Sequence, residues 1–205
     1  MTSNILKDKQ QTLPIACIIM ASGLGNRFGE NKLLYNIQDK PLLQHILETT
    51  GKLPFAERIA VTRHQEVVDL CNALNIKCVL HAEPYQSDTV RIALENLGEF
   101  TGYLFCTGDQ PFLKEASLEK LCSSFLDAPD FIHRTIFANT PGNPVIFPAK
   151  FKEELKNLPQ DCGGSYLIKK YPEQVRYIPV QDSIELYDID TKEDLEKLFL
   201  RQNNI

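Results

Sequence analysis

The chain has 205 residues, of which 43% are hydrophobic and 24% are charged, and its formal net charge at pH 7 is −5. This length and apolar content suit one α/β domain with a sizeable core, and the negative charge argues against a general nucleic-acid surface. No apolar run approaches the length that crosses a bilayer, and the first dozen residues lack a signal-peptide core, so we expect a cytoplasmic protein that contacts no membrane.

Strand-like and helix-like segments alternate along residues 13–205, which we expect to form the domain, after a loose polar tail over residues 1–12. The predicted strands cover residues 15–19, 58–62, 76–80, 103–106, 130–138, 145–147 and 175–180, and a short strand is expected over 33–37. The predicted helices cover residues 41–50, 65–74, 88–97, 115–126, 149–157, 164–170 and 192–202. This alternation predicts a single-domain, doubly wound α/β fold, with a mostly parallel sheet and helices on both faces.

A glycine loop follows the first predicted strand and contains Gly23, Gly25 and Gly29 together with Arg27 and Lys32. Glycines let backbone N–H groups approach an anion closely, and the two cations add positive charge, so the pattern predicts a polyphosphate site. The G-x-G-x-x-x-G spacing differs from the dinucleotide fingerprint, and no Ser or Thr follows Lys32 as in a P-loop. The alternative is an ordinary glycine turn with two solvated cations.

Four further motifs follow this loop in order, over residues 108–111 (GDQP), 142–145 (GNPV), 161–165 (DCGGS) and 188–195 (DIDTKEDL). With the loop, they resemble over nearly the whole chain the nucleotidyltransferase family that includes the molybdenum cofactor cytidylyltransferases and guanylyltransferases. The resemblance implies a Rossmann-like nucleotidyltransferase fold. The segments 21–23 (ASG) and 31–32 (NK) look more like the cytidylyl branch, since the guanylyl branch usually shows Gly-Gly and Asp-Lys there.

Nucleotidyl transfer requires cations, backbone donors and a metal around the phosphates, and it needs no nucleophilic Ser or Cys. The resemblance implies that Lys32 lies against the α-phosphate, and we expect Arg27 to hold the β- and γ-phosphates. Asp109, at the end of a predicted strand, is the candidate ligand for Mg²⁺, which prefers oxygen ligands. The alternatives are that Lys32 is a surface lysine, that Arg27 forms an ion pair with Glu30, and that Asp109 is a turn aspartate that caps its own backbone.

The predicted nucleotide site combines the glycine loop with the start of a helix and the turn before Asp109. Its residues are Ala21, Ser22, Gly23, Leu24, Gly25, Arg27, Lys32, Ser87, Thr89 and Gly108. The cytidylyl branch has a hydroxyl-rich stretch near Ser87, but here Asp88 interrupts the hydroxyls, so the choice of base stays open. The alternative is that Ser87 or Asp88 is a helix N-cap.

The predicted acceptor site is formed by Gln110, Asn143, Gly163, Gly164 and Ser165, because glycines before a helix offer N–H groups to an anion. The leading hypothesis is Mg²⁺-dependent transfer of CMP from CTP to molybdopterin, with a molybdenum hydroxylase as the recipient of the product. The alternatives are GTP as donor, a sugar or alcohol phosphate as acceptor, or a non-catalytic carrier of the cofactor.

Three acidic and sulfur groups have open roles. Asp188 and Asp190 are candidates for a second metal, although a helix cap explains Asp190 better because Thr191 and Asp194 follow it. Cys162 lies in a glycine loop, where a packed thiol is favoured over a sensor of metal or sulfur. The other five of the six cysteines lie in or beside apolar segments, and we expect free, buried thiols.

Overall fold

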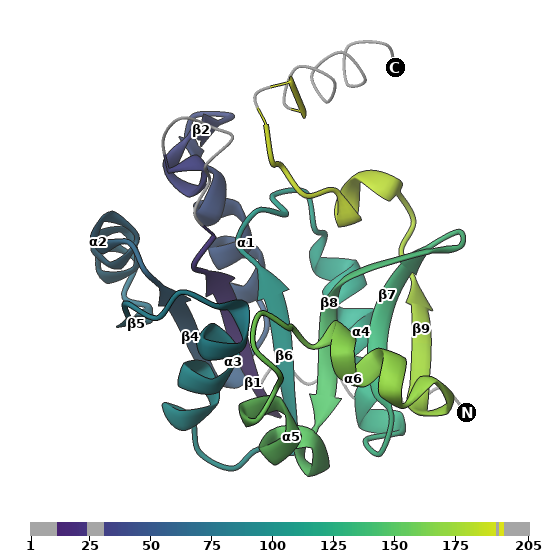
Figure 1. The fold of residues 1–205 in the computed structure, drawn as a ribbon. Coiled ribbons are helices and arrows are strands. Elements are labelled where there is room, and N and C mark those ends of the chain that lie inside the picture. The colour runs from purple at the N-terminus through teal and green to yellow at the C-terminus, as the bar shows by residue number, and fades with distance from the viewer. Residues whose placement is uncertain (1–11, 24–30, 192, 195–205) are drawn as a thin grey trace.

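The computed structural model describes residues 12–23, 31–191 and 193–194, and a seven-stranded sheet lies at its centre (Figure 1). The strand order is β5-β4-β1-β6-β8-β7-β9, and only β8 runs antiparallel to its neighbours, β6 and β7. The strands are β1 (Leu13–Ala21), β4 (Phe55–Thr62), β5 (Lys77–Leu80), β6 (Gly102–Thr107), β7 (Ile132–Phe137), β8 (Thr140–Pro148) and β9 (Val175–Pro179). The predicted mostly parallel sheet is therefore confirmed. A separate hairpin pairs β2 (Asn36–Ile37) with β3 (Lys40–Pro41).

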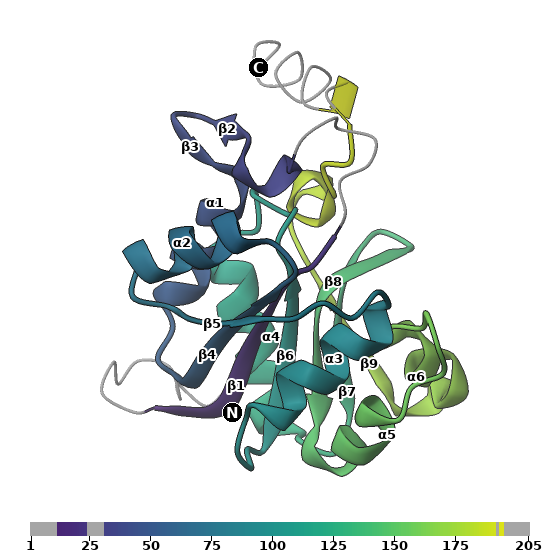
Figure 2. The same cartoon turned by 60° about the vertical axis from the view of Figure 1, so that its left-hand side comes forward.

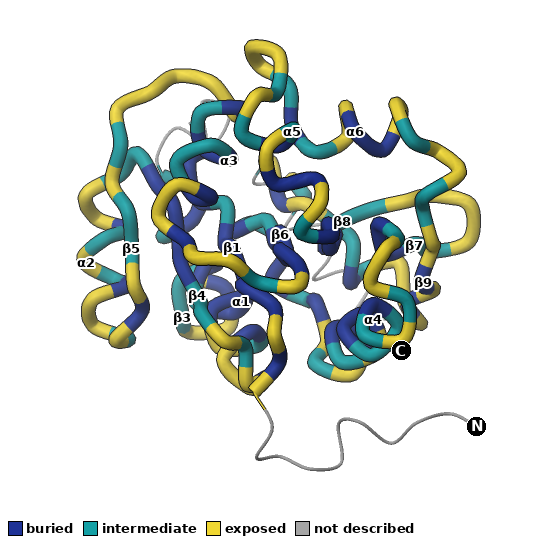
Figure 3. Tube along the Cα trace, turned by 90° about the horizontal axis from the view of Figure 1, so that it is seen from below, coloured by how far each residue is buried: buried dark blue, intermediate teal, exposed yellow. Residues whose placement is uncertain are grey.

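Helices cover both faces of the sheet (Figures 1 and 2). One face carries α1 (Leu42–Gly51), α2 (Gln65–Ala73) and α4 (Glu115–Asp127), and the other carries α3 (Gln86–Glu95), α5 (Lys152–Lys156) and α6 (Ser165–Lys170). Side chains alternate along a strand, so Ile15, Cys17 and Ile19 of β1 enter one core while Ala16 and Ile18 enter the other. This two-sided burial explains the unbroken apolar run of β1, which lies in the buried centre of the sheet (Figure 3).

Some elements differ from the sequence-based expectation. The predicted strand over 33–37 is a 3₁₀ turn, Lys32–Leu34, followed by β2, because the Asn31 side chain accepts the Leu33 N–H at 3.2 Å and caps a helical turn. The predicted strand over 145–147 is part of the C-terminal half of the longer β8. Of the predicted helix over 192–202, only residues 193 and 194 lie in the described part, where both are helical. Residues 1–11 of the expected tail lie outside it.

None of the described helices combines the length and the apolarity needed to cross a membrane. All six cysteines are free thiols, and Cys17, Cys71, Cys106 and Cys122 are buried. This agrees with the expectation of buried thiols for these four, whereas Cys78, which was also expected to be buried, is half-buried.

The sheet places two loops at one edge. β1 and β6 are parallel neighbours, so the glycine loop after β1 and the Gly108–Asp109 turn after β6 leave the sheet side by side. The N–H of Gly108 donates to the carbonyl of Met20 at 2.9 Å and joins the two exits. Ligands of open α/β sheets bind at such an edge, beyond the carboxyl ends of the strands.

Candidate active site

Lys32 is the centre of an ion-pair network that joins three distant parts of the sequence. Its Nζ lies 2.8 Å from Oδ2 of Asp109 and 2.7 Å from Oδ1 of Asp190. The residue is only 6% exposed, so the alternative of a surface lysine is wrong. Burial opposes the positive charge, but the two carboxylates outweigh it and raise the pKa of Lys32.

Among the described residues, only one of the two carboxylate oxygens of Asp109 has a partner. Oδ2 accepts from Lys32, whereas Oδ1 is buried and has no hydrogen-bond partner among the described residues. The carboxylate therefore does not cap its own turn, and it is the backbone carbonyl of Asp109 that accepts the Ile189 N–H at 3.1 Å. An unpaired buried oxygen is costly, so a further cation at this point would fit the site.

The segment that contains Asp188 and Asp190 returns to the site from the C-terminal part of the chain. Partial burial of its carboxyl group, and then repulsion from Asp109, raise the pKa of Asp188 to about 6, although the residue as a whole is exposed. Asp194 accepts the N–H groups of Asp190 and Thr191 at 3.1 and 2.8 Å. Asp194 is thus the side chain that caps the backbone here, and the Asp190 carboxylate faces Lys32 instead.

Within the described ranges, no cluster of three His, Cys, Asp or Glu side chains is arranged to hold a metal by itself. Mg²⁺ is commonly held by one or two carboxylates and completed by substrate phosphates and water. The unpaired Oδ1 of Asp109 fits a site of this kind, in which one carboxylate and the substrate phosphates hold the metal together.

The start of the glycine loop is fixed through its carbonyl groups. The Ser22 carbonyl accepts from Nε and Nη2 of Arg63 at 2.9 and 2.6 Å, and the Gly23 carbonyl lies 3.0 Å from Nε2 of His64. In a trans peptide the N–H points opposite to the carbonyl, so the Gly23 N–H points away from Arg63. The predicted residues Leu24, Gly25 and Arg27 lie outside the described residues, and so does the suggested partner Glu30.

A cavity of about 360 Å³, which we call the loop cavity, lies beside this segment. It is lined by residues from the ends of β1 and β6, from the end of β4 and from the start of α3, including Met20, Ser22, Gly23, Arg63, Gln86, Thr89, Thr107 and Asp109. Ser22 is 8% exposed, and its Oγ donates to the Val61 carbonyl at 3.1 Å and lies 2.9 Å from Nε2 of His81. The side chain of Ser22 at this wall is therefore held in one orientation.

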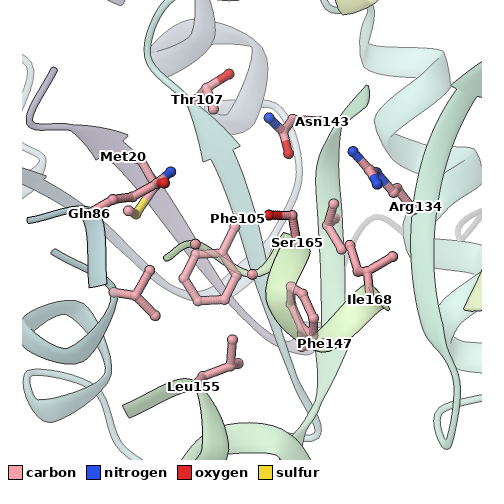
Figure 4. Close-up of a pocket in the computed structure, with 14 residues that line it drawn as sticks. Met20, Gln86, Phe105, Thr107, Arg134, Asn143, Phe147, Leu155, Ser165 and Ile168 are labelled. Carbon is pink, nitrogen blue, oxygen red and sulfur yellow. The ribbon is translucent and has the colours of Figure 1, made fainter. Parts of the chain in front are cut away.

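A second cavity of about 170 Å³, the aromatic cavity, lies on the side of the sheet covered by α3, α5 and α6 (Figure 4). Its lining includes Met20, Gln86, Phe105, Thr107, Arg134, Asn143, Phe147, Gly163, Gly164 and Ser165. Figure 4 shows the polar ends of Thr107, Asn143 and Arg134 on one side of this cavity and the rings of Phe105 and Phe147 below them. Met20, Gln86 and Thr107 line both cavities, which are therefore adjacent.

The structure divides the predicted site residues between these cavities and the protein interior. Ser22, Gly23 and Thr89 line the loop cavity, and Asn143, Gly163, Gly164 and Ser165 line the aromatic cavity. The other described residues of the predicted site, apart from Asp109 in the loop cavity, line neither of the two: Ala21, Lys32, Ser87, Gly108 and Gln110. Gln110 is 2% exposed and donates to the Leu186 carbonyl at 3.2 Å, which supports the segment leading to Asp188.

Neither Ser87 nor Asp88 is the N-cap of α3, which is Tyr85, although Asp88 contributes to the cap. Helix α3 begins at Gln86, and Oδ2 of Asp88 accepts the Tyr85 N–H at 3.3 Å from within the first turn. Ser87 is buried within that turn.

Sequence reasoning missed Arg63, Gln86 and Arg134. Arg63 directly follows a predicted strand, and this position could have marked it. Gln86 and Arg134 belong to no motif, and only the packing of the chain brings them to the cavities.

A family model and a sequence relative both place the chain among the nucleotidyltransferases. The model of the MobA-like NTP transferase domain matches residues 17–175. The chain is 26% identical over 194 residues to the probable molybdenum cofactor guanylyltransferase of Aquifex aeolicus (strain VF5), with 92% of each chain covered.

Solved structures share the fold. Rv0371c from Mycobacterium tuberculosis H37Rv superposes with a TM-score of 0.79 at 25% identity, covering 91% of this chain and 98% of that one, and its complex with manganese gives 0.72 at 23% over 90% and 97%. CMP:2-keto-3-deoxy-manno-octonic acid synthetase, solved with CTP, gives 0.77 at 16% identity over 93% and 99%, a likeness that shows the fold alone. The family match spans most of the sheet and both cavities, and the chain therefore belongs to the MobA-like NTP transferase domain family and is a nucleotidyltransferase.

Proposed function

We propose that this nucleotidyltransferase moves CMP from CTP to the terminal phosphate of molybdopterin and releases pyrophosphate. The observation that carries the proposal is the pair of adjacent cavities, which share Met20, Gln86 and Thr107. Asp109, the partner of Lys32, lies on the wall of the loop cavity. A transfer between two bound substrates needs two sites that meet at the reacting atoms.

In the proposed reaction the nucleotide occupies the loop cavity and the pterin occupies the aromatic cavity. An oxygen of the acceptor phosphate attacks the α-phosphorus, the bond to the β-phosphate oxygen breaks, and pyrophosphate leaves with that electron pair. A phosphate monoester loses its second proton near pH 6, so the attacking oxygen needs no general base at neutral pH. Lys32 would stabilise the negative charge that builds up around the α-phosphorus.

We further propose that Asp109 holds Mg²⁺. The unpaired Oδ1 of Asp109 supports this assignment, and the related Rv0371c structure has been solved with manganese. The metal would neutralise the phosphates of the nucleotide and of the leaving pyrophosphate. In this proposal the chain itself orients the phosphates. The Gly23 N–H, which points away from Arg63, would donate to one of them.

The choice of CTP rests on the segments 21–23 and 31–32, which resemble the cytidylyl branch. The second candidate is GTP, because the relative from Aquifex aeolicus is named as a probable guanylyltransferase. The side chain of Ser22 occupies a position where the guanylyl branch usually has glycine, and it takes up space at the wall of the loop cavity.

The test is incubation of the protein with molybdopterin, Mg²⁺ and each of CTP, GTP, UTP and ATP, with detection of dinucleotide by mass and of released pyrophosphate. We expect product with CTP. Product with GTP but not with CTP would reject the cytidylyl assignment. Absence of product with both CTP and GTP would reject either the proposed acceptor or the proposed class of donor.

A lysine variant tests the role assigned to Lys32. We expect Lys32→Ala to lose at least about 100-fold in turnover, the effect of removing one charge-stabilising donor. Lys152→Ala is the matched control, because Lys152 is also buried, at 9% exposure, and pairs with Glu99 at 2.6 Å away from both cavities. Wild-type turnover in Lys32→Ala would show that the lysine has no part in the reaction.

A further inference from the structure

Arg134 places a positive charge in the aromatic cavity. It comes from β7, and it is the only charged residue among the described residues that line this cavity. The remaining lining is apolar or uncharged, so the charge of any ligand bound here is met first by Arg134.

No described residue neutralises the guanidinium of Arg134. Its Nε donates to the Gly142 carbonyl at 2.9 Å, while Nη1 and Nη2 have no hydrogen-bond or ion-pair partner among the described residues. Burial lowers the pKa of Arg134, as expected for a charge with poor compensation. Arg91, by contrast, forms ion pairs with Asp88 and Glu95. The guanidinium nitrogens of Arg63 donate to the carbonyls of Ser22 and Pro84.

A guanidinium with free terminal nitrogens is a fork that matches the oxygens of a phosphate or a carboxylate. One edge of Arg134 is fixed by the bond to Gly142, so the rest of the fork is held in one orientation. In Figure 4 its nitrogens lie beside Asn143, on the polar side of the cavity.

The opposite side of the cavity favours a planar ring. Phe105 and Phe147 meet edge to face with their centroids 5.8 Å apart, and Met20 and Ile168 complete the apolar surface. The cavity volume of about 170 Å³ is close to the ~150 Å³ of an apolar protein cavity that binds benzene. There is therefore room for an aromatic ring beside the charged group.

From these observations we infer that Arg134 binds an anionic group of the acceptor and so selects, for the aromatic cavity, a planar aromatic compound that carries a phosphate or carboxylate. This inference rests on the proposed function in taking that cavity as the acceptor site. It adds a specificity residue that belongs to none of the sequence motifs.

The test is direct binding without nucleotide, metal or turnover, so that its failure is distinct from failure of the proposed transfer. The probes are 2-naphthyl phosphate, 2-naphthoate, the neutral 2-naphthol and inorganic phosphate, titrated into the whole chain by calorimetry or NMR. We expect 2-naphthyl phosphate or 2-naphthoate to bind at least about tenfold more tightly than 2-naphthol and than inorganic phosphate, and the stronger of the two identifies the anion.

Variants assign the charge to one residue. Arg134→Gln should weaken binding of the preferred anion at least about tenfold, the usual worth of a charged hydrogen bond, and leave 2-naphthol within twofold. Arg134→Lys keeps the charge without the fork, should fall between the two, and serves if the Gln variant does not fold. Arg176→Gln is the control, because Arg176 lies on the neighbouring β9 and stacks over Phe131 at 4.1 Å, outside the cavity.

Three results would overturn the inference: equal affinity of the wild type for the anionic and the neutral ring, no measurable binding of either anionic ring, or unchanged affinity in both Arg134 variants. If the transfer reaction is also active, Arg134→Gln should raise KM for the acceptor and leave KM for the nucleotide unchanged.

Discussion

The substitution Gly164→Ala tests how tightly the aromatic cavity is built. A Cβ at position 164 would lie 2.8 Å from Cζ and 2.9 Å from Cε2 of Phe147, both well inside ordinary van der Waals contact. Gly164 has helical dihedral angles, φ −55° and ψ −20°, so alanine brings no backbone strain. The ring of Phe147 must therefore move, or the loop must.

The size of the effect follows from two opposing contributions. Replacing glycine where its conformation suits alanine stabilises by about 0.4–1 kcal/mol, whereas overpacking a core costs about 1–3 kcal/mol. Phe147 is 1% exposed and packs against Phe105 and Phe151, so overpacking should dominate. We expect a net loss of about 1–2 kcal/mol, which lowers Tm by about 2–8 °C in a chain of this size.

The ring can also relieve the clash by moving into the aromatic cavity, which would spare stability but fill the acceptor space. The assay therefore combines urea unfolding with the KM for the acceptor or the affinity for 2-naphthyl phosphate. Gly98→Ala is the matched control, since its Cβ would meet only Phe100 at 3.9 Å. If Gly164→Ala matched the wild type in stability and in ligand affinity, the close approach of Gly164 to Phe147 would have no energetic meaning.

Two more predictions concern the metal and a buried histidine. Asp109→Asn removes the carboxylate charge while keeping the shape of the side chain. We expect the affinity for Mn²⁺ in the presence of nucleotide, measured by EPR titration, to fall at least about tenfold. Asp182→Asn is the control, because Asp182 is exposed and caps the N–H of Ile184; an equal loss in both variants would refute the assignment of Asp109. His133 is fully buried, and burial lowers its pKa below the usual 6.5, so below pH 6.5 the unfolded chain gains a proton that the folded chain does not and stability is lost. We expect His133→Asn to lose less unfolding free energy than the wild type between pH 7.5 and 5.5, and an equal loss would exclude His133 as the cause.

The sheet edge could be predicted from sequence because its determinants are local. The apolar run of β1 and the glycines after it predict a buried strand followed by a candidate ligand loop, and the Gly108–Asp109 turn repeats this pattern after β6. Parallel pairing of the two strands then brings Lys32 to Asp109, as expected.

Contacts between distant segments could not be predicted in the same way. The interpretation of Asp190 as part of a helix cap relied on the local pattern with Thr191 and Asp194, and that pattern does form. It leaves the Asp190 side chain able to pair with Lys32, which lies 158 positions away in the sequence. Arg134 is a single charge within a strand. Only the antiparallel pairing of β7 with β8 places it against Gly142 and beside Asn143.

The ion-pair network also limits the part that Lys32 can play in the reaction. A lysine whose pKa is raised by two carboxylates stays protonated at neutral pH, so it is a source of positive charge and cannot be a general base. The carboxyl groups of Asp109, Asp188 and Asp190 outnumber this single ammonium, and in the proposed reaction a triphosphate would bring further negative charge to the same edge of the sheet. A divalent cation that accompanied the nucleotide would offset this repulsion, and the ammonium of Lys32 would then be able to face the phosphates.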